Sequence, residues 1–327
     1  MQYQELVISE QGRLDKLLAA QLSQSRNQIE KLIREGLVDV EGKCVTKPSF
    51  KLSVGDRVRY CFRQASSSAS STVPMRVDFD IDILYEDDDL LVINKPSGLV
   101  VHPAPSVKEP TLVDWLVQKG ISLSTISGEE RHGIVHRIDK ETTGALVVAK
   151  NNQTHQLLSE QLQDKSMGRY YLALIDLPLK ENKCVEAPIA RNPKNRLKMA
   201  VVEGGRDAKT EFARVAESSH DTALIAAKLY TGRTHQIRVH LESLGRHILG
   251  DALYGFKSKK GKIPRVYLHA YMLYLIHPTT KKRLEVVAPL FDDMDRYIEK
   301  NFDKGEIDEK IQKRHFQDCF ASFGHSS

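Results

Sequence analysis

Apolar residues fall into short runs that alternate with amphipathic segments over most of the chain. From residue 90 onward, five runs have the length and composition of buried strands: Leu90–Ile93, Ala145–Ala149, Tyr171–Ile175, Ala223–Leu229 and Val266–Leu275. Apolar residues three and four positions apart predict helices at Leu112–Val117, His155–Leu162 and Thr234–Leu244. Strands and helices do not alternate with the regularity of a doubly wound sheet. We therefore predict an α+β fold around a mixed sheet.

The N-terminal segment has a shorter pattern of its own. Leucines at helical spacing predict a helix that begins near Leu14. Ser25 and Gln28 form a capping-box pattern for a second helix, which Gly36 ends. Short strands follow from residue 37 onward. This order predicts a small, separate module over residues 12–63.

Charge distinguishes this module from the rest of the chain. The net charge is +5, and residues 12–63 hold eleven Lys and Arg against six Asp and Glu, which accounts for all of it. A small basic module beside a neutral body is typical of a nucleic-acid-binding segment attached to an enzyme, although an ordinary charged surface is the alternative. Residues 64–74, rich in Ser and without charge up to Thr72, predict a flexible linker. The body then spans 75–300, and 301–327 predict a helical extension that frays into a disordered tail.

Several classes of protein are excluded by what the sequence lacks. No apolar stretch approaches the ~20 residues that a membrane span requires, and the N-terminus has no secretory-signal pattern. The four cysteines are widely spaced and form no CxxC pair, which favours incidental thiols in a reducing cytoplasm. Nucleotide-binding glycine motifs are absent. His136, His235 and His240 lack the spacing and acidic partners of a metal site, so we expect neither metal nor cofactor.

The segment Gly133–Lys150 holds the most informative polar residues. Ile134 and Val135 predict the end of one strand, and Thr142, Thr143 and Gly144 predict a tight turn into the next. Asp139 would then lie on a loop between two core strands, where functional residues are common. A carboxylate that only caps the turn is the alternative, and the local pattern leaves both open.

The same segment resembles the signature of the RluA-type pseudouridine synthases, His-Arg-Leu-Asp-x-x-Thr-Ser/Thr-Gly. Here the matching residues are His136, Arg137, Ile138, Asp139, Thr142, Thr143 and Gly144. The resemblance implies that Asp139 is a catalytic nucleophile, attacking either the sugar C1′ or the base C6 of a uridine that has left its stack. It also implies the mixed-sheet fold of that family.

Two further blocks resemble motifs of the same family. In Thr231–Gly255, Arg233 precedes Ile237 by four residues, which predicts that it projects toward the buried side of a helix. The resemblance implies that its acidic partner is Asp139, whose ionised form it would favour. In the second block, Arg169–Leu174, the alignment selects Tyr171 rather than Tyr170 to stack on the uracil and lie near C5.

The N-terminal module resembles the αL RNA-binding module, through Gly12–Asp15, Ser25-Arg26 and Gly55–Val58. The resemblance implies RNA contacts from basic residues of its helices, namely Arg13, Lys16, Arg26 and Arg34. Arg137 is expected to enter the RNA where the target base leaves. The segments 133–144 and 187–191 are most similar to the RluD-like branch, which acts on large-subunit ribosomal RNA. We expect a monomer.

Two other functions remain open at this point. A non-catalytic RNA-binding assembly factor would also explain the basic module. A hydrolase could use Asp139 on a glycosidic bond, but such enzymes generally need a second carboxylate as acid. The nearest candidate, Glu141, is expected to face away in a turn.

Overall fold

The computed structural model describes residues 3–22, 26–62, 75–103, 107–126, 132–258 and 263–323. The chain forms two compact units, one built from residues 1–75 and 125–132 and the other from residues 76–124 and 133–327. Within the described residues, no helix has both the length and the apolar character needed to cross a membrane.

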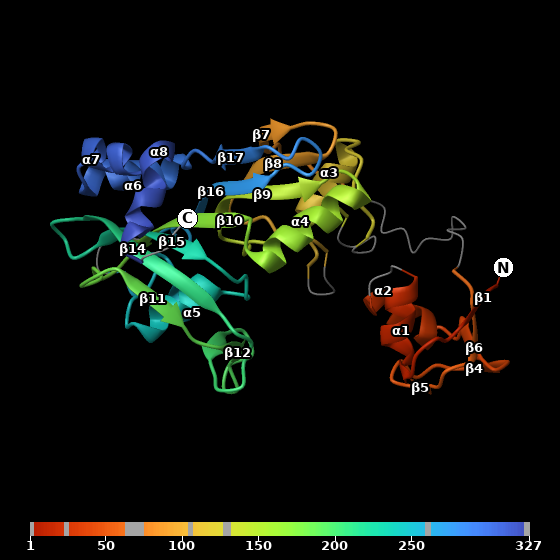
Figure 1. The fold of residues 1–327 in the computed structure, drawn as a ribbon. Coiled ribbons are helices and arrows are strands. Elements are labelled where there is room, and N and C mark those ends of the chain that lie inside the picture. Colours follow the sequence, from red (N-terminus) through yellow and green to blue (C-terminus); the bar gives the residue numbers. More distant parts are fainter. Residues whose placement is uncertain are drawn as a thin grey trace. The chain divides into compact units, whose positions relative to one another are not determined.

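The N-terminal unit packs two helices, α1 (Leu14–Gln21) and α2 (Arg26–Arg34), with a small sheet of strand order β1-β6-β3-β4 (Figure 1). The strands of this unit are β1 (Gln4–Val7), β2 (Gly12–Arg13), β3 (Val38–Val40), β4 (Lys43–Cys44), β5 (Lys51–Leu52) and β6 (Arg57–Tyr60). The predicted helices and the strand after Gly36 are therefore confirmed. The expected capping residue Ser25 and the linker 64–74 lie outside the described residues.

The second unit is built on one large sheet of strand order β11-β14-β15-β10-β16-β9-β8-β7, with β17 paired to β16. Its strands are β7 (Asp82–Glu86), β8 (Leu90–Lys95), β9 (Thr143–Ala149), β10 (Gly168–Ile175), β11 (Lys183–Glu186), β14 (Lys209–Glu217), β15 (Ala223–Leu229), β16 (Leu268–Ile276) and β17 (Arg283–Val287). Strands β16 and β9 pair in parallel, and the other pairs are antiparallel. The predicted α+β fold with a mixed sheet is confirmed.

Alternate residues of β10 separate the two faces of this sheet. Tyr171 belongs to a core with α3 (Leu112–Gln118) and α5 (Gln236–Ser243). Tyr170 faces a second core formed with the C-terminal helices. The remaining elements are α4 (Asn152–Asp164), the hairpin β12 (Ile189–Arg191) and β13 (Met199–Val201), η2 (Ala252–Tyr254), α6 (Asp292–Asn301), α7 (Lys304–Lys310), α8 (Lys313–Phe316) and η3 (Gln317–Phe323). Figure 1 shows α6, α7 and α8 together beside the sheet.

The predicted C-terminal helical extension packs against the sheet. Phe316 and Phe320 are buried, and their rings lie 5.9 and 5.3 Å from the ring of Tyr170. Asp303 caps α7 by accepting a hydrogen bond from the backbone of Glu306. Aromatic burial against the sheet holds this segment in place despite its weak local periodicity, and the helical part of the predicted extension is confirmed as far as residue 323. The last four residues lie outside the described part.

The segment that carries Asp139 also differs from the prediction. Ile134 makes only an isolated bridge to Val148, so no strand ends at residues 134–135. The turn lies at residues 140–141, where the Thr142 N–H donates to the Asp139 carbonyl at 3.1 Å, and β9 already begins at Thr143. The expected turn at 142–144 is therefore placed too late.

Gly144 explains why the chain enters the sheet here. A Cβ at this position would lie 2.3 Å from the carbonyl oxygen of Ala270, because β9 pairs with β16 at this point. Its φ of +108° is also a conformation that only glycine adopts readily. The close approach of the two strands fixes the start of β9, and with it the loop that presents Asp139.

Candidate active site

Asp139 lies on the loop before β9, with about 19% of its side chain exposed. It borders two cavities, of about 240 and 60 Å³. The two cavities share five of their lining residues: Arg137, Ile138, Asp139, His235 and Arg238. The carboxylate is therefore accessible from two adjoining hollows.

A buried ion-pair chain positions this carboxylate. Arg238 lies on α5 and is only 8% exposed. Its Nε and Nη2 donate to the two carboxylate oxygens of Asp251 at 2.7 and 2.8 Å, and its Nη1 donates to Asp139 Oδ2 at 3.3 Å. The two-point pair with Asp251 fixes the plane of the guanidinium, so its remaining edge presents one N–H to Asp139.

The expected ion pair between Arg233 and Asp139 is wrong. Arg233 Nε donates to the backbone carbonyl of Asp207 at 2.8 Å, and in the described structure the arginine that pairs with Asp139 is Arg238. The prediction assumed helical spacing from Arg233 to Ile237. Helix α5 begins only at Gln236, because His235 is in the left-handed conformation, so Arg233 lies outside the helix.

His235 is a site residue that sequence reasoning considered only as a metal ligand. Its φ of +57° is strained for a residue with a side chain, and such strain is typical of functional sites. Nδ1 lies 2.9 Å from the Tyr254 hydroxyl, and Nε2 lies 3.9 Å from Asp139 Oδ2. Burial lowers the pKa of His235, which favours the neutral ring. Nothing in the sequence signals a left-handed residue at this position.

Tyr171 lines the smaller cavity together with Asp139, whereas Tyr170 points to the opposite face of the sheet. Tyr171 is only 5% exposed, and burial raises the pKa of its phenol, so the hydroxyl carries its proton at neutral pH. The register between β10 and β16 shifts between Tyr170 and Tyr171, and such irregularities often re-aim a side chain near a site.

Lys95 supports the loop that carries Asp139, a role that was not predicted for this lysine itself. Its fully buried ammonium donates to the backbone carbonyls of Pro96, Leu99 and Lys140 at 2.7, 2.8 and 3.1 Å. Burial lowers the pKa of Lys95 to about 7. The lysine thus ties the turn after β8 to the residue that follows Asp139.

The residues predicted to bind RNA differ in exposure and in their ion pairs. Arg137 is exposed and lines both cavities. In the N-terminal unit, Lys16 is exposed, Arg13 pairs with Asp15 at 2.9 Å and Arg34 approaches Glu30 at 3.8 Å. The side chain of Arg26 lies outside the described residues. Glu141 was expected to face away, but it lines the larger cavity.

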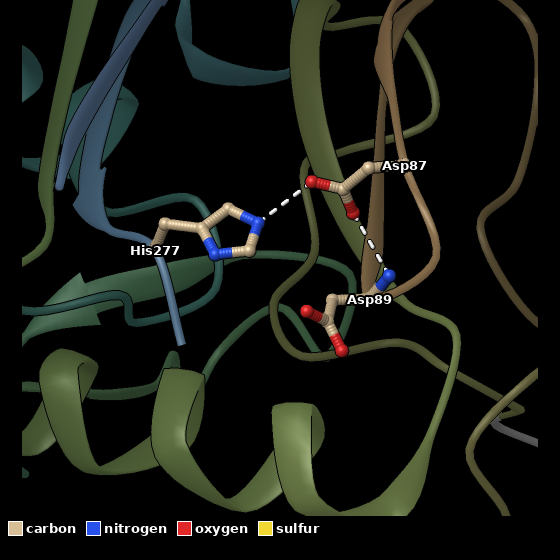
Figure 2. Close-up of side chains that lie close together, drawn as sticks. All are labelled: Asp87, Asp89 and His277. Atoms are coloured by element: carbon tan, nitrogen blue, oxygen red, sulfur yellow. Dashed lines mark hydrogen bonds and ion pairs between the residues drawn. The ribbon is translucent and has the colours of Figure 1, made fainter. Parts of the chain in front are cut away.

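A cluster of Asp87, Asp89 and His277 has the composition of a metal site (Figure 2), but none of the three residues lines either cavity. Asp87 Oδ2 accepts from the Tyr85 hydroxyl and from His277 Nε2, both at 2.6 Å. His277 Nδ1 accepts from the backbone N–H of Thr280 at 3.1 Å. Because both imidazole nitrogens are already hydrogen-bonded, the cluster serves to join the β7–β8 turn to the β16–β17 hairpin.

A family model described as RNA pseudouridylate synthase matches residues 89–243, and one for the S4 domain matches residues 12–58. The chain is 47% identical to an uncharacterized RNA pseudouridine synthase of Helicobacter pylori strain J99, over 95% of this chain and 96% of that one. It is 40% identical to ribosomal large subunit pseudouridine synthase D of Nitrosomonas europaea, over 86% and 82% of the two chains. The structure of human RNA pseudouridylate synthase domain containing 1 matches with a TM-score of 0.54 and 25% identity, over 66% of this chain and 87% of that one.

These relatives and the mixed-sheet fold define a class of RNA-modifying enzyme with an S4 domain at its N-terminus. The chain belongs to the RNA pseudouridine synthase family and isomerises uridine in RNA. Membership decides against both alternatives left open by the sequence, the non-catalytic assembly factor and the hydrolase.

Proposed function

We propose that this enzyme isomerises specific uridines of large-subunit ribosomal RNA, with Asp139 as its nucleophile. The observation that carries the proposal is the placement of Asp139. It borders two adjoining cavities, and a buried arginine that is itself fixed by Asp251 donates to one of its oxygens. That arrangement fixes the orientation of the carboxylate, as a nucleophile requires.

Uridine and pseudouridine are isomers, so the reaction needs no oxidant, reductant or group donor. The N1–C1′ bond breaks, the C5–C1′ bond forms, and the proton on C5 moves to N1 through solvent or a side chain. Asp139 forms a covalent intermediate at C1′ or at C6, and is released when the new bond is complete. The proposal therefore includes no cofactor.

The target base must leave its stack before Asp139 can reach it, at a cost of a few kcal/mol. Arg137 can enter the RNA stack where the target base has left it, because Arg137 is exposed and lines both cavities beside Asp139. Tyr171 offers a ring face for the uracil and a protonated phenol near it. The geometry thus supports base flipping into the space around Asp139.

The choice of ribosomal RNA rests on the relatives. Proteins of Nitrosomonas europaea and Zymomonas mobilis named ribosomal large subunit pseudouridine synthase D are each 40% identical to this chain. The S4 domain and its basic residues support binding to structured RNA. We propose further that the enzyme acts in the cytoplasm as a monomer, since a single chain supplies the residues around Asp139 described above.

The experiment is a map of pseudouridines in ribosomal RNA from cells with and without the gene. Complementation with the wild type should restore the missing positions, whereas Asp139→Asn should not. Asp292→Asn is the matched control, because Asp292 is exposed on α6 and distant in sequence from the site. If the deletion removes no pseudouridine from large-subunit RNA, the substrate is wrong. Restoration by Asp139→Asn would instead overturn the nucleophile.

A further inference from the structure

Arg169 is a buried arginine that the reaction described so far does not use. It lies on β10, two residues before Tyr171 and therefore on the same face of the strand. Only 9% of its surface is exposed, and it lines the smaller cavity with Asp139 and Tyr171. Its guanidinium is thus held within the site, under the surface of the protein.

This guanidinium has no partner within the described structure. Its Nε is buried without a hydrogen bond, and no described carboxylate lies within ion-pair distance of it. Burial lowers the pKa of Arg169, and the positive charge of Arg233 lowers it further. An arginine stays charged in proteins, so the unpaired group costs stability as the fold stands.

Arg233 contributes a second positive charge to the same cavity. Its Nε donates to the Asp207 carbonyl, and both arginines line the smaller cavity. Gly232 lies directly against Arg169, since a Cβ there would be 2.6 Å from Arg169 Nη1. Two like charges held beside a glycine form a cradle for an anion rather than a structural ion pair.

We propose that Arg169 and Arg233 bind a backbone phosphate adjacent to the flipped uridine. The proposal rests on the RNA substrate and the site at Asp139. Phosphates are the anionic groups of unmodified RNA, and a guanidinium binds them through two parallel N–H donors. Binding would pair the buried charge of Arg169 and relieve its repulsion with Arg233. It would hold the sugar of the target nucleotide over Asp139.

The experiment combines a change in the enzyme with a change in the RNA. The RNA is a fragment that the wild-type enzyme modifies, made with a neutral methylphosphonate at either of the two positions flanking the target uridine. Kd, KM and kcat are measured for the wild type and for Arg169→Met on each RNA. Arg296→Gln is the matched control, because Arg296 is an exposed arginine on α6.

We expect Arg169→Met to raise Kd and KM by roughly 10- to 100-fold on normal RNA, since hydrogen bonds to charged groups have this strength. A methylphosphonate at one of the two positions should raise the Kd of the wild-type enzyme by a similar factor. The same RNA should not raise the Kd of Arg169→Met further. Gly232→Ala should raise Kd and KM less, because the added Cβ displaces the guanidinium of Arg169 but does not remove its positive charge. Arg296→Gln should behave as the wild type.

Thermal unfolding distinguishes this function from a structural one. Removing an unpaired buried charge should leave the melting temperature of Arg169→Met unchanged or raise it. A lower melting temperature, with equal losses on normal and neutralised RNA, would overturn the phosphate site. If the substitution and the methylphosphonate instead reduce affinity independently, and the pH profile of turnover shifts, then Arg169 acts through Tyr171. That result would also overturn the phosphate site. Because Kd does not depend on turnover, the comparison holds even if Asp139→Asn proves active and the proposed nucleophile fails.

Discussion

At the scale of single residues, two arginines five positions apart have different tasks in this site. Arg238 is buried on α5 and joins Asp251 to Asp139, whereas Arg233 precedes the helix and binds a backbone carbonyl. The sequence predicted an arginine partner for the carboxylate and chose the wrong one. The difference follows from the left-handed His235, because the helix begins at Gln236 and not at Thr234 as predicted.

Substitution of these two arginines should therefore have different consequences. Arg238→Ala leaves Asp251 buried without its partner, and we expect it to cost about 3–5 kcal/mol in the free energy of unfolding and nearly all activity. Arg233→Ala removes a partly exposed group, and its melting temperature should stay close to that of the wild type. Thermal unfolding and turnover of the two variants check this. Equal destabilisation by both would contradict the assignment.

Tyr171→Phe separates stacking from proton transfer. The ring and its burial are kept, so RNA affinity and melting temperature should change little. Turnover should fall by about 10²–10⁴-fold if the phenol takes part in removing the C5 proton. Release of tritium from RNA labelled at C5 measures this step directly. Normal tritium release would mean that Tyr171 only packs against the base.

His136 should make the protein sensitive to acid. Burial lowers its pKa to about 3 from the ordinary value of 6.5, and Nε2 accepts the N–H of Val147 at 3.2 Å. Between these values the unfolded chain binds a proton that the folded chain does not, so the free energy of unfolding falls as the pH falls from 6.5 toward 3. In His136→Gln this dependence should weaken by about 1.4 kcal/mol per pH unit. Denaturant unfolding between pH 6 and 4 tests the difference, and identical slopes would contradict it.

At the scale of elements, the sequence predicted best where the periodicity is strong. The strand from Ala223 to Leu229 begins and ends where it was expected, because a continuous apolar run buried on both faces leaves little choice. The loop of Asp139 was placed less well. Its shape depends on the pairing of β9 with β16, more than a hundred residues further along the chain. The role of Lys95 was not predicted for the same reason, since the three carbonyls around its ammonium come together only in the fold.

The C-terminal helical extension was predicted but its packing on the sheet was not, and this packing leads to a prediction of its own. Phe316 is fully buried and also lies 5.0 Å from the ring of Tyr271, so Phe316→Ala should cost about 3–5 kcal/mol in the free energy of unfolding. Phe323→Ala, at a half-buried position near the end of η3, is the control and should cost less. Denaturant unfolding of both variants provides the comparison. An unchanged midpoint for Phe316→Ala would show that this segment does not pack on the sheet.

At the scale of the whole molecule, charge and chemistry lie in different units. Residues 12–63 hold the net charge of +5, and the residues around Asp139 all belong to the second unit. Binding through phosphates releases counterions, so a basic unit of this kind adds affinity that weakens with salt. The separation suggests that the S4 unit contributes affinity and site choice, and that the second unit contributes the reaction.

Deletion of residues 1–72 should therefore weaken binding to structured ribosomal RNA and flatten its dependence on salt, because fewer phosphates are contacted. Turnover at saturating RNA should change little, since the truncated enzyme keeps Asp139, Arg238 and Tyr171. Arg26→Glu combined with Arg34→Glu should reproduce part of the effect in the full-length chain. Binding across a salt series and single-turnover rates separate the two contributions. If truncation leaves affinity unchanged and abolishes the single-turnover rate, the N-terminal unit takes part in the reaction itself, and the separation of binding from chemistry does not hold.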